Sequence, residues 1–549
     1  MNERSNGLVR EVEKRRTFAI ISHPDAGKTT LTEKLLLYGG AIQTAGQVSA
    51  RRAQRSATSD WMDLEKQRGI SITSTVLQFP YAGYTINLLD TPGHQDFGED
   101  TYRTLLAADS AVMLIDAAKG VEPQTKKLFA ICRARRIPLF TFINKMDRPS
   151  RNPLELLDEL ESVLGIGAFA MTWPLGNGPS FKGVYERATR QVHLFERSAH
   201  GAKRAHVEVS SLEDPQIAEL LDEHSYREFR DGLELLEGAG ADFDRAAMLH
   251  GDVTPVFFGS AVTNFGVQNF LDAFVHLSPP PQPRAASTGR VDPASPEFSG
   301  FVFKIQANMD PRHRDRVAFV RICSGKFERD MTVRNARTGK DVRLSRAMKL
   351  FAGDRESLDA AYAGDVVGLA NPGVFAIGDS LFEGSTARSF ERIPAFAPEH
   401  FAAVRSIDTS SYKSFGKGIA QLREEGAVQV MYPLGSMRTE PILAAVGALQ
   451  FEVVKYRLES EYNVKTVFTR LPYGLALRVT GEPQSVAGAQ LPTNAKLVED
   501  WDGSPVALFE SEWSVRLAEE WNPALRFVPF TAIDEDQHEE ALGVRAGTP

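Results

Sequence analysis

Cysteine is scarce in this chain, since only Cys132 and Cys323 occur among its 549 residues. Two cysteines this far apart, outside any Cys/His spacing that binds zinc, exclude a disulfide-rich scaffold and a cysteine-based zinc site. They fit buried thiols in a reducing cytosol. Runs of about 20 apolar residues are also lacking, which excludes a transmembrane helix. The charged N-terminus does not resemble a signal peptide. We therefore expect a cytoplasmic protein with no membrane partner.

The chain also lacks an excess of positive charge. It has 63 Lys and Arg against 71 Asp and Glu, for a net charge of −8. This balance argues against a protein that coats nucleic acid by bulk electrostatics. Any RNA contact must then come from local clusters, although such clusters are more often solvated surface. The candidates are Arg51, Arg52 and Arg55, and Arg312, Arg314 and Arg316.

The length predicts roughly three or four domains. Residues 1–285 are predicted to form a doubly wound α/β domain, because short apolar runs typical of buried parallel strands alternate with helical stretches. The runs are 17–21, 85–90, 111–116, 139–144 and 256–261. Between about 150 and 250 this alternation lapses into acidic helical stretches and aromatic, strand-like pieces. We interpret that part as an insertion.

Two further domains are predicted after a segment rich in proline and serine, 278–298, which cannot continue a helix and is expected to be a linker. Short β-type runs punctuated by Gly and Asp predict a β-barrel domain over 286–392. Residues 393–549 are predicted to form a C-terminal α/β (α+β) domain with amphipathic helices at 416–426 and 449–462. No internal repeat is recognisable in the sequence.

The first of four candidate site clusters follows the strand 17–21 and opens a helix. A loop at such a junction presents backbone N–H groups and the helix dipole to an anion, so a phosphate is expected there. By the pattern of phosphate-binding loops, Lys28 would contact the β- and γ-phosphates and the Thr29 hydroxyl would bind Mg²⁺. Ser22 replaces the usual first glycine, so its Cβ must be accommodated in a tight turn. The alternative is an ordinary strand-to-helix turn. The cluster consists of Ser22, His23, Pro24, Asp25, Ala26, Gly27, Lys28 and Thr29.

The second cluster ends the strand 85–90 and consists of Asp90, Thr91, Pro92, Gly93 and His94. A carboxylate at that position can hold Mg²⁺ through water, and the Gly93 amide can approach a γ-phosphate and sense its loss. His94 is the candidate catalytic residue, because it could orient the attacking water. A lone surface histidine usually has no function, so this role depends on the four residues before it.

The third cluster follows the buried strand 139–144 and consists of Asn144, Lys145, Met146 and Asp147. A carboxylate in the plane of the base accepts two hydrogen bonds from guanine N1 and N2, whereas adenine would leave it unpaired. Asp147 is therefore predicted to select GTP over ATP. Asn144 would brace the loop, and the Lys145 stem would cover a face of the base. The alternative is a polar turn after a strand.

The fourth cluster follows the strand at 256 and contains Gly259, Ser260 and Ala261. A backbone N–H of this loop, at Ser260 or Ala261, could reach guanine O6. Three small residues are a weak signal alone. All four clusters, however, lie at the C-terminal ends of predicted strands, in the order that one nucleotide-binding crevice requires.

These four motifs resemble those of the GTPase superfamily, and the sequence Asp-Thr-Pro-Gly-His resembles that of translational GTPases. Residues 66–73 are similar to the switch segment of elongation factors. In that family a threonine after the Gly-Ile pair reaches Mg²⁺, and Ser71 stands there in this chain with its hydroxyl retained. The resemblance also implies an apolar gate beside the catalytic histidine, made here by Ile70 and Pro24.

Within that superfamily, the chain is similar over nearly its whole length to the family of peptide chain release factor three, the bacterial class II release factors. The similarity is carried by the stretches 22–30, 304–327, 422–430 and 447–468. It implies a ribosome-stimulated GTPase that promotes dissociation and recycling of class I peptide release factors after translation termination.

The same resemblance implies the ligands and partners. GTP or GDP would be the bound nucleotide, Mg²⁺ the cofactor and the ribosome, with its RNA and proteins, the partner of a monomeric chain. Direct contact with class I release factors is left open. An elongation- or ribosome-protection-type GTPase is the alternative, although elongation factor G carries further domains that this length does not accommodate. A binding-only module fits less well with the complete set Lys28, Asp90, His94 and Asp147.

Overall fold

The computed structural model describes residues 3–41, 65, 71–196, 206–212, 214–238, 242–307, 316–351, 354–394, 396–436, 438 and 440–529. None of the helices in these ranges is both long enough and apolar enough to cross a bilayer. Several residues considered above lie outside the described ranges: Arg51, Arg52, Arg55, residues 66–70 with Ile70, Arg312 and Arg314.

The described residues of the first domain form a seven-stranded sheet in the order β2-β3-β1-β4-β5-β11-β6. All neighbours are parallel except β2, which forms an antiparallel hairpin with β3. The predicted doubly wound α/β fold is confirmed. In sheet order the strands are Thr75–Tyr81, Tyr84–Asp90, Arg15–Ser22, Ser110–Asp116, Leu139–Asn144, Val253–Phe258 and Gly167–Ala170.

Both faces of the central strands are buried, which explains why their sequences are apolar without alternation. Along β1, Phe18 belongs to the core on one face of the sheet and Ile21 to the core on the other. The first core includes residues of α2 and α10, and the second includes residues of α4 and α5. The bounds of these helices are Lys28–Tyr38, Val267–Leu277, Gly98–Ala107 and Pro123–Ala134, and α1 precedes the sheet at Glu3–Glu13.

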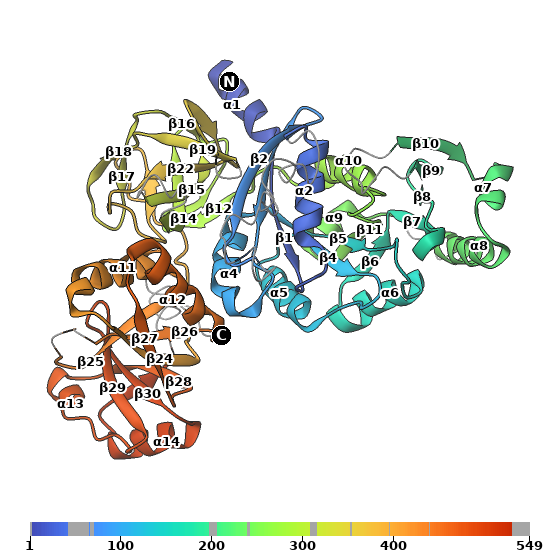
Figure 1. Cartoon of the computed structure of the whole chain (residues 1–549). Coiled ribbons are helices and arrows are strands. Elements are labelled where there is room, and N and C mark those ends of the chain that lie inside the picture. Colours follow the sequence, from blue (N-terminus) through green and yellow to red (C-terminus); the bar gives the residue numbers. More distant parts are fainter. Residues whose placement is uncertain are drawn as a thin grey trace, which may run out of the picture.

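The predicted insertion builds a small subdomain at one side of the sheet (Figure 1). Its strands form an antiparallel sheet, β10-β9-β8-β7, and Trp173 of β7 packs on Phe258 of the main sheet at 5.6 Å between ring centroids. The sequence did not predict that β6, within this part, pairs in parallel with β11 and extends the main sheet. The elements are α6 Pro153–Glu159, a short π-helix Leu160–Leu164, β7 Thr172–Leu175, β8 Gly183–Glu186, β9 Gln191–Glu196, β10 His206–Ser211, α7 Pro215–Leu220, α8 Glu223–Gly238 and α9 Arg245–His250.

The predicted β-barrel domain is confirmed. Its sheet runs β18-β17-β23-β14-β15-β22-β19-β20, with the pair β16-β21 beside it. The predicted linker is more structured than expected, because β12 (Arg284–Ala286) and β13 (Gly289–Val291) form a hairpin within it. The barrel strands are β14 Ser299–Ala307, β15 Arg316–Ser324, β16 Lys326–Glu328, β17 Thr332–Asn335, β18 Asp341–Arg343, β19 Ala347–Phe351, β20 Asp354–Ser357, β21 Ala360–Tyr362, β22 Val366–Ala370 and β23 Ser380–Phe382.

The described part of the C-terminal domain contains two units with the same β-α-β-β-α-β topology. The first sheet runs β27-β24-β26-β25 and the second β29-β30-β28-β31, and β25 pairs with β29 to join them into one antiparallel sheet. This structural repeat was not recognisable in the sequence. The elements are β24 His400–Ser406, α11 Tyr412–Glu424, β25 Gln429–Pro433, β26 Ile442–Ala445, α12 Leu449–Tyr462, β27 Thr466–Leu471, β28 Leu475–Thr480, α13 Pro483–Ala487, β29 Ala495–Asp500, β30 Pro505–Phe509, α14 Glu512–Trp521 and β31 Arg526–Val528.

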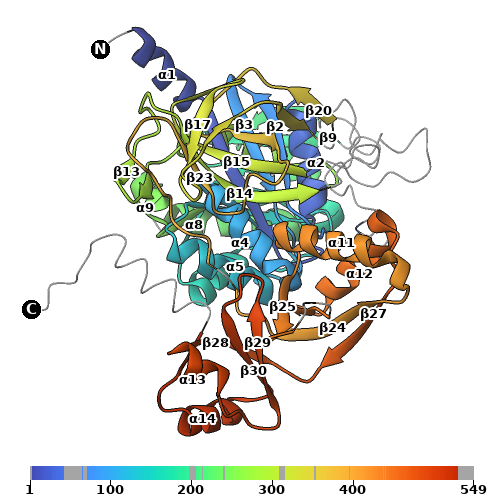
Figure 2. The same cartoon turned by 90° about the vertical axis from the view of Figure 1, so that its left-hand side faces the viewer.

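Buried charged groups join the first domain to the barrel, which lies against it in Figure 2. Arg321 of β15 donates to Asp109, which precedes β4, at 2.5 Å, and both side chains are 1% exposed. Asp109 also pairs with Arg284. Removing one member of such a pair leaves an uncompensated buried charge, so the pair resists separation of the two domains. This contact holds the barrel against the sheet at the N-terminal end of β4, the edge opposite to the C-terminal ends of the strands.

Candidate functional site

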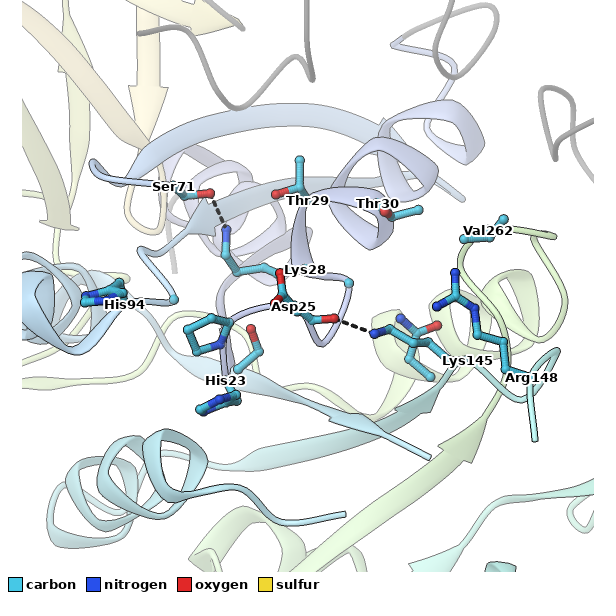
Figure 3. A pocket seen from close by; sticks show the side chains of 15 residues that line it. His23, Asp25, Lys28, Thr29, Thr30, Ser71, His94, Lys145, Arg148 and Val262 are labelled. Carbon is cyan, nitrogen blue, oxygen red and sulfur yellow. Dashed lines mark hydrogen bonds between the residues drawn. The ribbon is translucent and has the colours of Figure 1, made fainter. Parts of the chain in front are cut away.

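A pocket of about 400 Å³ lies at the C-terminal ends of β1, β3 and β5. Its size is typical of small-ligand sites, and its position is where doubly wound sheets bind nucleotides. It brings together residues from the first three predicted clusters and from the switch segment (Figure 3). The lining residues are Ser22, His23, Pro24, Asp25, Gly27, Lys28, Thr29, Thr30, Ser71, Gly93, His94, Asn144, Lys145, Arg148 and Val262.

The phosphate-binding loop has the backbone that such a loop requires. Asp25 and Gly27 adopt positive φ angles of 67° and 98°, whereas Ser22 does not. The serine therefore fits at the first position because the strained conformations lie further along the loop. A Cβ at position 27 would overlap the Asn144 side-chain amide, which explains the glycine there. The loop leads directly into α2, whose first N–H groups are unpaired by the helix itself and suit an anion.

Lys28 lies in the pocket but bonds to protein groups in this structure. Its Nζ donates to the Asp90 carboxylate at 2.5 Å and to the Ser71 hydroxyl at 3.3 Å. Both charged side chains are almost fully buried, at 7% and 3% exposure. The predicted phosphate contact therefore requires phosphate oxygens to compete with Asp90 for the ammonium group, and it stays a prediction.

The second cluster lies directly beside the phosphate-binding loop. The Thr91 hydroxyl donates to the carbonyl of Ile20 in β1 at 2.6 Å, which ties the second cluster to the strand that leads into the phosphate-binding loop. A Cβ at Gly93 would lie 3.7 Å from the Pro24 Cα, an ordinary van der Waals distance, so the two loops lie side by side at this point. His94 lies at one end of the pocket and Lys145 at the other (Figure 3). The His94 ring is one-third exposed, and its Nδ1 accepts a hydrogen bond from the Asp96 N–H at 3.2 Å.

Asn144 braces three loops, as its position in the third cluster predicts. Its Nδ2 donates to the Ala26 carbonyl at 2.9 Å, and its Oδ1 accepts from the Ala261 N–H at 2.8 Å. Met146 is buried behind the pocket and donates its N–H to the Gly259 carbonyl. One buried amide side chain thus holds the phosphate loop, its own loop and the fourth cluster in register.

Lys145 has a partner that the sequence analysis missed. Its Nζ donates to the Asp116 carboxylate at 2.8 Å and to the Asp25 carbonyl at 2.5 Å. Burial would raise the pKa of Asp116, but the bonds from Lys145 and the Ala118 N–H outweigh it and hold that pKa below its usual value. Asp116 and the Asp25 carbonyl fix the position of the Lys145 amine. The aliphatic part of the Lys145 side chain lines the pocket. The sequence offered one indication of this partner, because Asp116 is an acidic residue at the C-terminal end of the predicted strand 111–116.

Asp147 has an unmet hydrogen-bonding requirement. Its Oδ1 is buried and has no hydrogen-bond partner among the described residues. Leaving a buried carboxylate oxygen unpaired costs about 1–3 kcal/mol or more, so such an atom suits a donor supplied by a ligand. Asp147 itself does not line the pocket, so its predicted bonds to the N–H groups of guanine stay a prediction. Arg148 and Val262, which line the pocket next to the third and fourth clusters, were not predicted.

The N–H groups of the fourth cluster already have acceptors. Ser260 donates to the Phe265 carbonyl at 2.9 Å, and Ala261 donates to Asn144. Both residues are buried beside the pocket rather than on its surface. To contact guanine O6 as well, the N–H of Ser260 or Ala261 would have to bond to two acceptors at once. The assignment stays a prediction.

Oxygen ligands for magnesium gather around Lys28. The side chains of Thr29 and Ser71 both line the pocket near Lys28, whose amine binds the Asp90 carboxylate (Figure 3). Hydroxyl, carboxylate and phosphate oxygens are the ligands that Mg²⁺ prefers. In the described ranges no group of three His, Cys, Asp or Glu side chains could hold a metal ion. The hydroxyls of Thr29 and Ser71 fit an ion that nucleotide phosphates would also bind, and this magnesium site stays a prediction.

Comparison with known proteins decides the family. Residues 13–280 match the model of the elongation factor Tu GTP binding domain, 297–384 match elongation factor G domain 2, and 390–519 match the C-terminal domain of class II release factor RF3. The chain is 59% identical to peptide chain release factor 3 of Cyanothece sp. over 97% of this chain and 98% of that protein. The protein of the same name from Rippkaea orientalis is 61% identical over 94% and 95%.

The chain belongs to the peptide chain release factor 3 family. It is therefore a translational GTPase that hydrolyses GTP, and it acts in translation termination. A crystal structure of a protein from Thermus thermophilus matches with a TM-score of 0.67 over 86% of this chain and 69% of that chain. At 23% identity that likeness shows the fold alone.

Membership of the release factor 3 family accounts for the pocket as a guanine nucleotide site. The first three sequence clusters meet there in the predicted order, and the fourth lies behind them. The roles of individual side chains toward nucleotide, magnesium and water stay predictions.

Proposed function

We propose that this release factor 3 family member acts on the ribosome after peptide release, where it promotes dissociation and recycling of class I release factors. The observation that carries the proposal is the similarity to peptide chain release factor 3 over 97% of the chain. The pocket that gathers residues of the first three clusters supports it, because a recycling cycle driven by GTP needs binding and hydrolysis in one site. We further propose a monomer that works in the cytoplasm, with the ribosome as its partner.

In this proposal the four clusters divide the work on GTP. The phosphate-loop amides and Lys28 bind the phosphates, and Asp147 with the loop braced by Asn144 selects guanine. Thr29 and Ser71 would hold Mg²⁺, which neutralises developing charge on the phosphates. Phosphoryl transfer needs little covalent chemistry from the chain, because positioning and charge stabilisation supply most of the acceleration.

His94 is the proposed catalytic residue, acting on the attacking water. Its Nδ1 lies 3.2 Å from the Asp96 backbone nitrogen and 3.3 Å from the Asp96 carboxylate, and these two contacts support a defined ring orientation. The one-third exposure of the ring leaves it open to a partner surface. We therefore propose slow turnover by the free protein and faster turnover when the ribosome fixes His94.

The test follows a labelled class I release factor on post-termination ribosomes. Adding the protein with GTP should speed departure of the label, and His94→Ala should bind GTP and yet fail to turn over repeatedly. GDP alone is the control. If hydrolysis is stimulated by ribosomes while the label departs at its unassisted rate, the recycling role is wrong. The function of an elongation- or ribosome-protection-type GTPase would then fit the protein better.

A further inference from the structure

Asp96 connects the candidate catalytic histidine to a different domain. It lies in a short 3₁₀ helix, Gln95–Phe97, directly after His94. Its N–H donates to His94 Nδ1 at 3.2 Å, and its carboxylate accepts from the Leu449 N–H at 2.8 Å. Leu449 is the first residue of α12 in the C-terminal domain, so one residue contacts both the histidine and that helix.

The helix end that Asp96 contacts is held firmly within its own domain. The Gln450 side chain accepts from the N–H groups of Val446 and Gly447 and donates to the Ala427 carbonyl. Further along α12, the Arg457 guanidinium pairs with Glu425 at 3.0 Å, and both side chains are nearly buried. The N-terminus of α12 therefore has a fixed position within the C-terminal domain. The position of the Asp96 carboxylate depends on the position of that helix end.

The fit between Asp96 and α12 is tight. The Asp96 side chain is only 12% exposed. A Cβ built on Gly447 would overlap the Asp96 carboxyl group, although the Gly447 backbone has no positive φ and would accept alanine. The glycine is explained by the close approach of the carboxylate and not by a turn conformation.

The same helix also packs on the segment that carries Ser71. Ile72, Phe97 and Val453 form a small apolar cluster, with Leu449 and Tyr456 packed against it. The N–H groups of Ile72 and Thr73 donate to the buried Glu65 carboxylate at 2.9 and 3.1 Å. Ser71, the proposed magnesium ligand, directly precedes Ile72. Helix α12 thus contacts Ile72, the neighbour of Ser71, and the segment that follows His94.

We propose that Asp96 is a positioning residue for GTP hydrolysis, which orients His94 only while α12 of the C-terminal domain is docked against it. Hydrolysis is then sensitive to the placement of the C-terminal domain, because displacing α12 removes the donor that holds the Asp96 carboxylate and, through it, the histidine ring. The inference rests on the proposed role of His94. It adds a second domain to a reaction whose other proposed residues all belong to the first.

The test measures ribosome-stimulated GTP hydrolysis of the full chain, with kcat and KM determined separately. Asp96→Ala removes the acceptor, and Gly447→Ala displaces the carboxylate from the other domain. Each should lower kcat by about tenfold with KM for GTP little changed, because the Asp96 segment loses its anchor on α12 and the His94 ring loses its fixed orientation, while the nucleotide contacts remain. Asp96→Asn retains an acceptor oxygen and should recover most of the loss. Gly416→Ala, in α11 of the same domain, has no atom within 4 Å of the added Cβ and should match the wild type.

The double variant separates positioning from general loss of structure. Once Asp96→Ala has removed the carboxyl group, an alanine at 447 meets nothing there, so the double variant should be no slower than Asp96→Ala alone within about twofold. Multiplicative losses, or a Gly447→Ala protein with wild-type kcat, would overturn the inference. If Gly447→Ala loses nucleotide binding, the comparison of Asp96→Ala with Asp96→Asn decides, and equal kcat values there also overturn it.

One further variant separates this inference from the proposed function. His94→Ala with wild-type turnover would remove the catalytic role of His94 and the inference with it. Slow His94→Ala beside normal Asp96→Ala and Gly447→Ala proteins would overturn the positioning role alone. Failure of release factor recycling would leave these hydrolysis measurements unaffected.

Discussion

Replacement of Asp147 by asparagine should change the base that the pocket accepts. In the structure Oδ1 of Asp147 is buried without a partner among the described residues, and Asn144 fixes the loop that carries it. If this carboxylate accepts the two N–H groups of guanine, its loss removes two charge-assisted hydrogen bonds of about 1.5–3 kcal/mol each. That sum corresponds to a loss in GTP affinity of roughly 10²- to 10⁴-fold.

The same variant should gain affinity for xanthine nucleotides. Xanthine has a carbonyl at position 2, so the amide of Asp147→Asn can donate where the carboxylate would repel. Titration of fluorescent GDP and XDP against wild type and variant should show the preference reversed, with the thermal unfolding midpoint unchanged as the control for folding. Unchanged GDP affinity in Asp147→Asn, or equal weakening of both nucleotides, would refute the assignment of guanine recognition to this carboxylate.

Three further predictions address hydrolysis, the switch segment and the thiols. His94→Ala should keep its GTP affinity and lose on the order of 10²-fold in ribosome-stimulated kcat, because water positioning matters only in the transition state; a normal kcat by single-turnover assay would make His94 structural. Ser71→Ala should weaken a non-hydrolysable GTP analogue with Mg²⁺ by about tenfold and leave GDP affinity unchanged in equilibrium titration, since only the triphosphate state uses the hydroxyl; equal losses for both would contradict this. Burial raises the pKa of Cys132 to about 12 and that of Cys323 to about 11, so neither thiol should react with a thiol reagent at pH 8 until the chain is unfolded, and rapid labelling of the native protein would contradict the buried assignment.

The central sheet could be predicted because its strands are buried on both faces. The runs 17–21 and 111–116 are apolar at nearly every position, a pattern typical of short parallel strands that helices cover on both faces. Helix α12 was predicted with the observed bounds, 449–462, from its amphipathic pattern. The short strand Gly167–Ala170 has no such pattern, and it joins the sheet only because β11 presents a free edge to it.

Contacts between distant segments could not be predicted from the sequence. The motifs for phosphate and guanine carry their own spacing, so each cluster was recognisable alone. The contact between Asp96 and Leu449 joins residues 353 positions apart, and no local pattern records it. The pairing of Lys28 with Asp90 was likewise missed, since motif reasoning assigns both side chains to a ligand and says nothing of their contact with each other.

The edge-to-edge union of the two C-terminal units has a consequence for aggregation. Strand β25 would be an open edge of the first unit if β29 did not pair with it through Met431, Tyr432 and Pro433. An unpaired edge strand is a template for pairing with another chain. A protein truncated after Leu471 would keep the topology of the first unit and expose this edge. We expect such a fragment to self-associate, because the second unit protects the edge of the first.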